Sequence, residues 1–234
     1  MHPDETMIQR DRYARIASQY DQAHTDAEHA MALSFLHGML GYVGAESVLD
    51  VGAGTGRAMR FLRQVCPDVR IVGIEPVEEL RRAGHQKGIP VGDLIDGDGY
   101  NLKFADGEFD VVSEVAVLHH VREPNRVVTE MLRVARKAVF LSDSNMFGGG
   151  SVPMRLLKQL VHAVGLWGVA NYLKTAGRGY SITEGDGLFY SYSVFDSIKL
   201  MRRHCRSIHM VNTSPSGANL YRTASHVAVL GIKA

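Results

Sequence analysis

Hydrophobic and polar positions along the first 145 residues repeat with two different periods. Apolar side chains three and four positions apart predict helices over residues 6–20 and 27–43. Short apolar runs predict strands near residues 47–51, 70–74, 89–95, 110–115 and 138–142. Helical patterns separate these runs near residues 56–65, 77–87 and 125–136. The alternation predicts a parallel sheet covered by helices on both faces, with its ligand site beyond the carboxyl ends of the strands.

The pattern changes after Ser142. Three glycines at residues 148–150 interrupt it, and residues 152–173 follow as one or two apolar helices around Trp167. We expect residues 148–205 to form a cap inserted into the sheet. Strand signals return at residues 207–211 and 226–232, on either side of a turn-rich stretch. The whole chain, residues 1–234, therefore reads as one domain with N-terminal helices (1–45), a binding core (46–147), the cap (148–205) and a terminal strand pair (206–234).

A glycine-rich turn follows the first predicted strand. Gly52, Gly54 and Gly56 let the backbone adopt positive φ, and the next helix offers unpaired N–H groups in its first turn. These features predict a site for a nucleotide-like ligand. Dinucleotide sites require the spacing G-x-G-x-x-G, but Arg57 occupies the position of that third glycine, which weakens a prediction of NAD binding.

Four ordered motifs between about residues 10 and 145 resemble those of class I S-adenosylmethionine (SAM) dependent methyltransferases of the small-molecule type. Asp50 with the three glycines resembles the first motif of that family, and Glu75 follows at the offset of a ribose-binding acid. Residues 97–112 resemble the adenine-binding loop and the strand after it. Residues 114–121 resemble the segment that closes over the methionine end of the cofactor.

The resemblance implies a fold and a set of cofactor-binding residues. The fold is α/β, a doubly wound Rossmann-like sheet of seven strands, of which six are parallel and the last is antiparallel. Adenine recognition is assigned to Asp98 and the Gly99 amide, with Asp93 as a competing register, and Tyr20 corresponds to a tyrosine that folds over the cofactor. The residues expected to bind SAM are Tyr20, Asp50, Gly52, Gly54, Gly56, Glu75, Pro76, Asp98, Gly99, Glu114 and Val115.

Candidate catalytic residues lie where the fourth and fifth strands end. His119 or His120 can act as a base near neutral pH, or can simply pack or cap. Asp143 can hold a histidine or contact the acceptor, and Asn145 is a candidate acceptor ligand, although turn chemistry explains both equally well. In the cap, Tyr190 and Tyr192 are candidate substrate-binding residues, and packing in the core is the alternative.

Composition narrows the partners. The net charge of +1 provides no basic field for nucleic acid or for a membrane, so we expect a small-molecule acceptor. Cys66 and Cys205 are too few for a metal cluster, the histidines are not spaced as metal ligands, and two separated thiols favour a reducing, cytoplasmic location. The N-terminal residues lack the pattern of a secretory signal. The apolar helices around Trp167 leave a homodimer open.

Together these observations predict a SAM-dependent methyltransferase that acts on an oxygen or nitrogen of a small polar metabolite, for example a sugar-like compound or a natural product. The product of the cofactor would be S-adenosylhomocysteine (SAH). Two alternatives remain. The first is an NAD-dependent oxidoreductase on a similar sheet, and the second is a SAM-binding sensor or partner subunit that transfers no methyl group.

Overall fold

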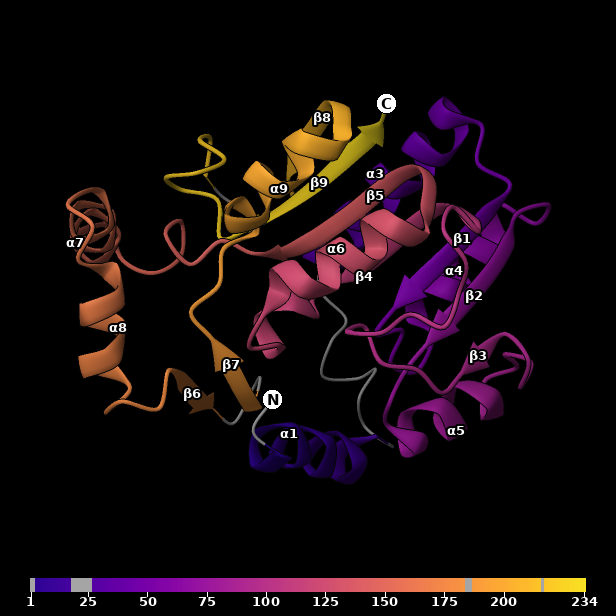
Figure 1. Cartoon of the computed structure of the whole chain (residues 1–234), viewed down its shortest axis with the longest axis horizontal. Helices are drawn as coiled ribbons and strands as arrows, with labels where there is room; N and C mark the ends of the chain where they lie inside the picture. Colours follow the sequence, from indigo (N-terminus) through magenta and orange to yellow (C-terminus); the bar gives the residue numbers. More distant parts are fainter. Residues whose placement is uncertain (1–2, 18–26, 184–186, 216) are drawn as a thin grey trace.

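A seven-stranded sheet forms the centre of the computed structural model, which describes residues 3–17, 27–183, 187–215 and 217–234. Its strand order is β3-β2-β1-β4-β5-β9-β8 (Figure 1). The strands are β1 (Ser47–Val51), β2 (Arg70–Ile74), β3 (Leu94–Ile95), β4 (Phe109–Val115), β5 (Ala135–Ser144), β8 (Cys205–Asn212) and β9 (His226–Lys233). Only β9 runs against its neighbours, so the predicted arrangement of six parallel strands and one antiparallel strand is confirmed.

Helices cover both faces of this sheet because successive strand residues point to opposite sides. On β1, Leu49 packs into one apolar cluster and Val48 into the other. The helices of the two layers are α3 (Ala27–Val43), α4 (Arg57–Val65), α5 (Glu78–Gln86), α6 (Pro124–Val134) and α9 (Ile198–His204). Residues of α6 and α9 belong to the cluster that contains Leu49, and residues of α3 and α4 belong to the cluster that contains Val48.

The third strand is much shorter than its apolar run suggests. We expected a strand near residues 89–95, but β3 contains only Leu94 and Ile95. Pro90 has no N–H for a ladder, and its carbonyl instead accepts hydrogen bonds from the amides of Asp93 (3.0 Å) and Leu94 (3.3 Å). A tight turn therefore replaces the first part of the expected strand.

The segment that we expected to form a cap divides into two parts. Helices α7 (Val152–Ala163) and α8 (Trp167–Lys174) stand at one end of the molecule, away from the large sheet (Figure 1). A small antiparallel pair, β6 (Tyr180–Thr183) and β7 (Gly187–Tyr190), connects them to the body. By contrast, the 3-10 helix η2 (Val194–Ser197) and α9 pack against α6 and the sheet. The part of the expected cap that stands apart from the large sheet is thus the stretch from α7 to β7.

The N-terminal helix α1 (Pro3–Ile16) lies between β7 and α5, beside the carboxyl edge of the parallel strands (Figure 1). Both elements contact it. The expected helix over residues 6–20 is therefore present with an earlier start, and residues 18–20 lie outside the described part of the chain. In the residues that the structure describes, no helix is both long enough and apolar enough to cross a membrane.

Candidate functional site

A cavity of about 1040 Å³, including its open mouth, lies at the carboxyl edge of the sheet. Its walls come from the turns after β1, β2, β3 and β4, from α1 and from β7. These turns carry four of the motifs that the sequence singled out. The cavity is therefore the place to test each predicted site residue.

The glycine turn after β1 forms one wall. Gly52 (φ 73°) and Gly54 (φ 57°) have backbone angles that other residues rarely adopt, and both line the cavity. A Cβ atom added to Gly52 would lie 2.6 Å from Cγ2 of Val117, so the close packing also requires glycine. Gly56 (φ 73°) precedes the first residue of α4 and does not line the cavity. Its role is to turn the chain into the helix.

Glu75, which follows β2, places a buried carboxylate in the cavity wall. Its Oε2 accepts a hydrogen bond from the Gly54 amide (3.0 Å), and its Oε1 accepts one from the Val77 amide (2.9 Å). Burial raises the pKa of Glu75 to about 7, although these two amides oppose the shift. Pro76 lines the cavity beside it. The carboxylate is thus fixed in position and retains lone pairs for a ligand.

Asp50 lies behind the glycine turn and does not line the cavity. It is buried in β1, where Oδ1 accepts a hydrogen bond from the Ser113 hydroxyl of β4 (3.2 Å). Burial raises the pKa of Asp50 to about 7, and the nearby Glu75 adds to the shift. This placement suits a residue that holds the turn in shape.

Of the two candidate adenine-binding acids, Asp98 faces the cavity and Asp93 does not. Asp98 and Gly99 both line it, and Asp98 Oδ1 accepts a hydrogen bond from the Tyr100 amide (2.9 Å). Asp93 instead forms an ion pair with Arg63 of α4 at 2.6 Å. The geometry therefore favours the register with Asp98.

Glu114, at the end of β4, shapes the next turn from behind. Its Oε2 accepts a hydrogen bond from the Val117 amide (3.1 Å), and its Oε1 accepts one from the Ser142 amide (3.0 Å). Burial and the nearby Asp143 raise the pKa of Glu114 well above its ordinary value. Val115 lines the cavity, whereas Glu114 does not. The turn includes Ala116, whose φ of 60° is unusual for a residue with a side chain.

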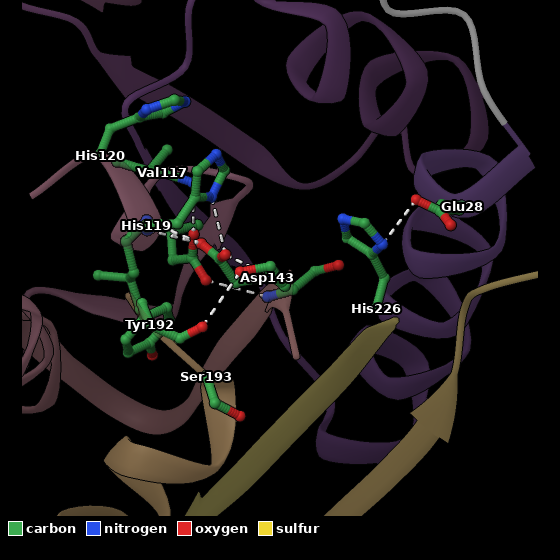
Figure 2. A network of polar contacts seen from close by, with 12 residues as sticks. Glu28, Val117, His119, His120, Asp143, Tyr192, Ser193 and His226 are labelled. Carbon is green, nitrogen blue, oxygen red and sulfur yellow. Dashed lines mark hydrogen bonds and ion pairs between the residues drawn. The ribbon is translucent and has the colours of Figure 1, made fainter. Parts of the chain in front are cut away.

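Asp143, from the end of β5, holds the 3-10 turn η1 (Leu118–His120). Its Oδ1 lies 2.8 Å from Nδ1 of His119, and its Oδ2 accepts a hydrogen bond from the Leu118 amide (2.8 Å). Figure 2 shows the His119 ring directed at this carboxylate. Burial alone would raise the pKa of Asp143, but the His119 charge and its hydrogen bond hold it below the ordinary value. Neither residue lines the cavity.

Of the three predicted catalytic residues, His120 is the one that lines the cavity. Its Nδ1 lies 2.7 Å from the Leu188 carbonyl oxygen, a contact that requires a proton on Nδ1. Nε2 of the neutral ring is then an acceptor, and the Tyr13 hydroxyl lies 2.8 Å away from it. The His119 ring packs against the other side, with 3.9 Å between ring centroids. His120 is thus held between α1 and β7, with Nε2 on the Tyr13 side, while Gln9 Nε2 lies 3.1 Å from the same Nδ1 that contacts the Leu188 carbonyl.

Polar residues of α1 complete the wall, and the sequence analysis missed them. Glu5, Gln9 and Tyr13 are four residues apart, so they share one face of the helix. The Tyr190 hydroxyl donates to Glu5 (2.8 Å), and Gln9 accepts a hydrogen bond from the Leu188 amide (2.8 Å). Their spacing alone gave no distinct signal, because polar residues also occupy the other sides of this helix.

The three predicted substrate-binding residues have different surroundings. Tyr190 lines the cavity. Tyr192 is buried in the core, where its hydroxyl lies 2.9 Å from that of Ser197. The Asn145 side chain accepts a hydrogen bond from the Ser193 hydroxyl (3.0 Å) and donates to backbone carbonyls, including that of Tyr221 (2.7 Å). Asn145 and Tyr192 do not line the cavity, and Tyr20 lies outside the described residues.

Comparison with known proteins gives matches to methyltransferases. Residues 49–142 match the family described as a methyltransferase domain. The demethylmenaquinone methyltransferase of Thermotoga maritima is 30% identical over 95 residues, which cover 41% of each chain. The phosphatidylethanolamine N-methyltransferase of Cereibacter sphaeroides is 32% identical over 117 residues, which cover 48% of this chain and 56% of that one. The chain thus spans about two fifths to just over half of these relatives.

Solved structures support the same fold over nearly the whole chain. The 1,6-didemethyltoxoflavin-N1-methyltransferase of Burkholderia thailandensis, solved with 1,6-didemethyltoxoflavin and SAH, has a TM-score of 0.63 at 16% identity and covers 98% of this chain and 89% of that one. The strand order and the solved structure define a Rossmann-like α/β domain. Residues 49–142 match a methyltransferase domain, which agrees with the predicted resemblance to SAM-dependent methyltransferases, and the solved structure shares the fold.

Proposed function

We propose that this chain transfers a methyl group from SAM to an oxygen or nitrogen of a small polar acceptor. One observation carries the proposal: a single cavity joins the glycine turn and Glu75 on one side to His120, Tyr13 and Tyr190 on the other. A nucleoside cofactor and a polar acceptor can therefore occupy neighbouring parts of the same enclosed space. Holding two reactants in line in such a space contributes roughly 7 to 11 kcal/mol to catalysis.

The residues at the first side fit the cofactor. Glu75 offers carboxylate lone pairs to the ribose hydroxyls, and Asp98 offers an acceptor to the adenine amino group. Gly52 and Gly54 line the cavity at the turn beside which the methionine part would lie. When bound, SAM would supply a methyl group carried on a positively charged sulfur, and the acceptor would attack the methyl carbon as the sulfur–carbon bond breaks.

His120 is the residue that we assign to proton removal. Its Nε2 accepts a hydrogen bond from the Tyr13 hydroxyl, and both side chains line the cavity. An acceptor that hydrogen-bonds to the Tyr13 oxygen can release its proton to that oxygen while the Tyr13 proton moves to Nε2. Asp143 and His119 act through packing and hydrogen bonds, because they fix the turn that carries His120.

The acceptor side of the cavity is polar and carries both signs of charge. Arg122 donates to the Glu5 carboxylate from Nε (2.9 Å), and the Tyr190 hydroxyl donates to the same group. Such a cluster favours an acceptor with several hydroxyl, amino or carbonyl groups. The relatives named above methylate a quinone precursor, a phospholipid headgroup and a nitrogen heterocycle according to their names, so the family covers varied acceptors.

Calorimetric titration of the purified chain with SAM, SAH and NAD tests the cofactor assignment. We expect binding of both adenosyl compounds and no heat with NAD. Binding of NAD alone would support the oxidoreductase alternative. The second step is incubation with SAM and a pool of metabolites, followed by detection of SAH. Binding of SAM without any SAH from a broad pool would favour the sensor alternative.

A further inference from the structure

Helices α7 and α8 carry most of the exposed apolar surface of the described residues. Of the sixteen large apolar side chains that are exposed there, ten lie between residues 152 and 173, each between 51% and 72% exposed. Neither helix has a single buried residue. Monomeric soluble proteins rarely expose apolar side chains in such a concentration, so the patch indicates an interaction surface.

The orientation of α7 is the opposite of that of an ordinary surface helix. Its polar side faces the body: Lys158 donates to the Gly149 carbonyl (2.7 Å), and Gln159 donates to the carbonyls of Phe147 (3.1 Å) and Arg222 (2.9 Å). Leu156 and Leu160, one turn apart, face outward and are both 62% exposed. Hydrogen bonds thus hold the helix in place while its apolar side remains available.

Helix α8 extends the same surface. Trp167 points toward the body, where its indole N–H donates to the Ser191 hydroxyl (2.9 Å). Val169, Tyr172 and Leu173 are three and four positions apart and are all exposed. The two helices contact each other at one end of the molecule (Figure 1), so their exposed apolar residues belong to the same end of the structure.

The Asp, Glu, Lys and Arg residues within this segment of the chain are all of one sign of charge. No aspartate or glutamate occurs between residues 144 and 183, whereas four Lys and Arg residues do. Lys158 is turned inward, and its pKa is lowered by burial and by nearby Lys174 and Arg155. Arg155, Lys174 and Arg178 remain at the surface. An apolar helical face with a basic border is the pattern of an element that lies in the interface of an anionic membrane.

We propose that the α7–α8 pair docks on an anionic lipid surface, with its leucines inserted at the headgroup boundary. A second copy of the chain fits less well, because a symmetric contact would bring two basic borders together without a carboxylate from this segment. The net charge of the whole chain predicts no membrane partner, but the charge of this segment differs from that average. The proposed contact is peripheral and needs no spanning helix.

Cosedimentation of the full chain with vesicles tests the proposal without any cofactor. The vesicles contain phosphatidylcholine alone or phosphatidylcholine with phosphatidylglycerol. We expect binding to the mixed vesicles, weaker binding at high salt, and a change in the emission of Trp167, the single tryptophan of the chain. Absence of binding to the mixed vesicles would overturn the proposal.

Two variants separate the apolar and the charged contributions. In L156Q/L160Q/L173Q we expect at least about a tenfold loss of affinity for the mixed vesicles. In R155Q/K174Q/R178Q we expect about a fivefold loss for each charge removed. The matched control M31Q/V91Q replaces exposed apolar residues elsewhere and should bind like the original chain. Equal binding by the leucine variant and the control would refute the assignment of the patch.

Sedimentation velocity without lipid tests whether a second copy of the chain covers the α7–α8 patch instead. A stable dimer that L156Q/L160Q/L173Q converts to a monomer would show that a second copy covers the patch, and it would overturn the proposal. None of the substituted side chains lines the cavity, so SAH affinity should be unchanged in all variants, and the thermal midpoint checks that each variant is folded. Failure of vesicle binding therefore leaves the proposed methyl transfer intact, and failure of SAM binding leaves the lipid proposal intact.

Discussion

Replacing Glu75 by glutamine changes one oxygen atom in the cavity wall and leaves the size of the side chain unchanged. In the structure both carboxylate oxygens accept backbone hydrogen bonds, from the amides of Gly54 and Val77. Glutamine keeps one acceptor oxygen and turns an NH₂ group toward the other amide. The variant therefore loses the negative charge and one acceptor for the ribose, while the surrounding backbone should keep its position.

The magnitude follows from these contacts. A hydrogen bond to a charged group contributes about 1.5 to 3 kcal/mol, so loss of one ribose contact predicts a SAH dissociation constant about 10- to 150-fold weaker. Two effects on folding oppose each other. The mismatched amide destabilises the fold by about 1 to 3 kcal/mol. Removing a carboxylate whose pKa burial has raised to about 7 is favourable by a similar amount, roughly 1.4 kcal/mol per pKa unit.

The assay is isothermal titration calorimetry with SAH at several pH values. Below pH 7 the free carboxyl of Glu75 is protonated, and ribose binding requires the carboxylate, so binding releases a proton. Affinity of the original chain should fall about tenfold per pH unit below pH 7, and that of Glu75→Gln should stay nearly flat. Asp50→Asn is the matched control, because Asp50 has a similarly raised pKa but does not line the cavity. An unchanged affinity in a folded Glu75→Gln protein would refute the ribose assignment.

The free protein has a matching pH dependence of stability. The folded pKa of Glu75 lies above its ordinary value of 4.5, so its contribution to stability is fully present below that value. The contribution is lost as the pH rises through about 7. The thermal midpoint of Glu75→Gln relative to that of the original chain should therefore be higher at pH 8 than at pH 5. The opposite order would indicate that the carboxyl is not desolvated in the free protein.

Three further substitutions test other parts of the site. His120→Asn should lower the rate of SAH formation about 10²- to 10⁴-fold with SAM affinity unchanged. The control Tyr192→Phe alters a buried hydroxyl outside the cavity and should keep the original rate. Equal rates of SAH formation in the two variants would show that His120 does not transfer the proton. Gly52→Ala should weaken SAH binding and lower the thermal midpoint, because its Cβ would lie 2.6 Å from Val117. Gly88→Ala, at a position with φ 91° and open space around it, controls for backbone strain alone. Similar losses of thermal midpoint in both variants would argue against the clash. Asp143→Asn should destabilise the fold by about 3 to 5 kcal/mol in thermal or urea unfolding. The substitution breaks the buried pair with His119 and can place the new NH₂ group against the Leu118 amide. A loss below about 1 kcal/mol would show that the pair contributes little to stability.

The sheet and the cofactor side of the cavity were predictable because their signals are local. β1 and the glycine turn are contiguous in the sequence, and the apolar runs of β2 and β4 are bounded by clear turns. Holding a histidine was one of the roles left open for Asp143, and its Oδ1 lies 2.8 Å from Nδ1 of His119. In contrast, the contacts of His120 with Gln9 and Tyr13 join residues 111 and 107 positions apart. Periodicity within one helix cannot indicate which distant turn that helix will meet.

This difference explains why family membership does not identify the acceptor. The motif-bearing stretch, residues 49–142, contains the glycine turn, Glu75 and Asp98, so it accounts for the cofactor side. The opposite wall comes from α1 and β7, which lie outside that stretch and are joined by Glu5 to Tyr190 and by Gln9 to Leu188. In the proposed function, acceptor choice depends on these two segments, which lie outside the seven-stranded sheet. A change in their polar contacts would alter the acceptor while the cofactor site stays the same, which is consistent with the varied substrates in the names of the relatives.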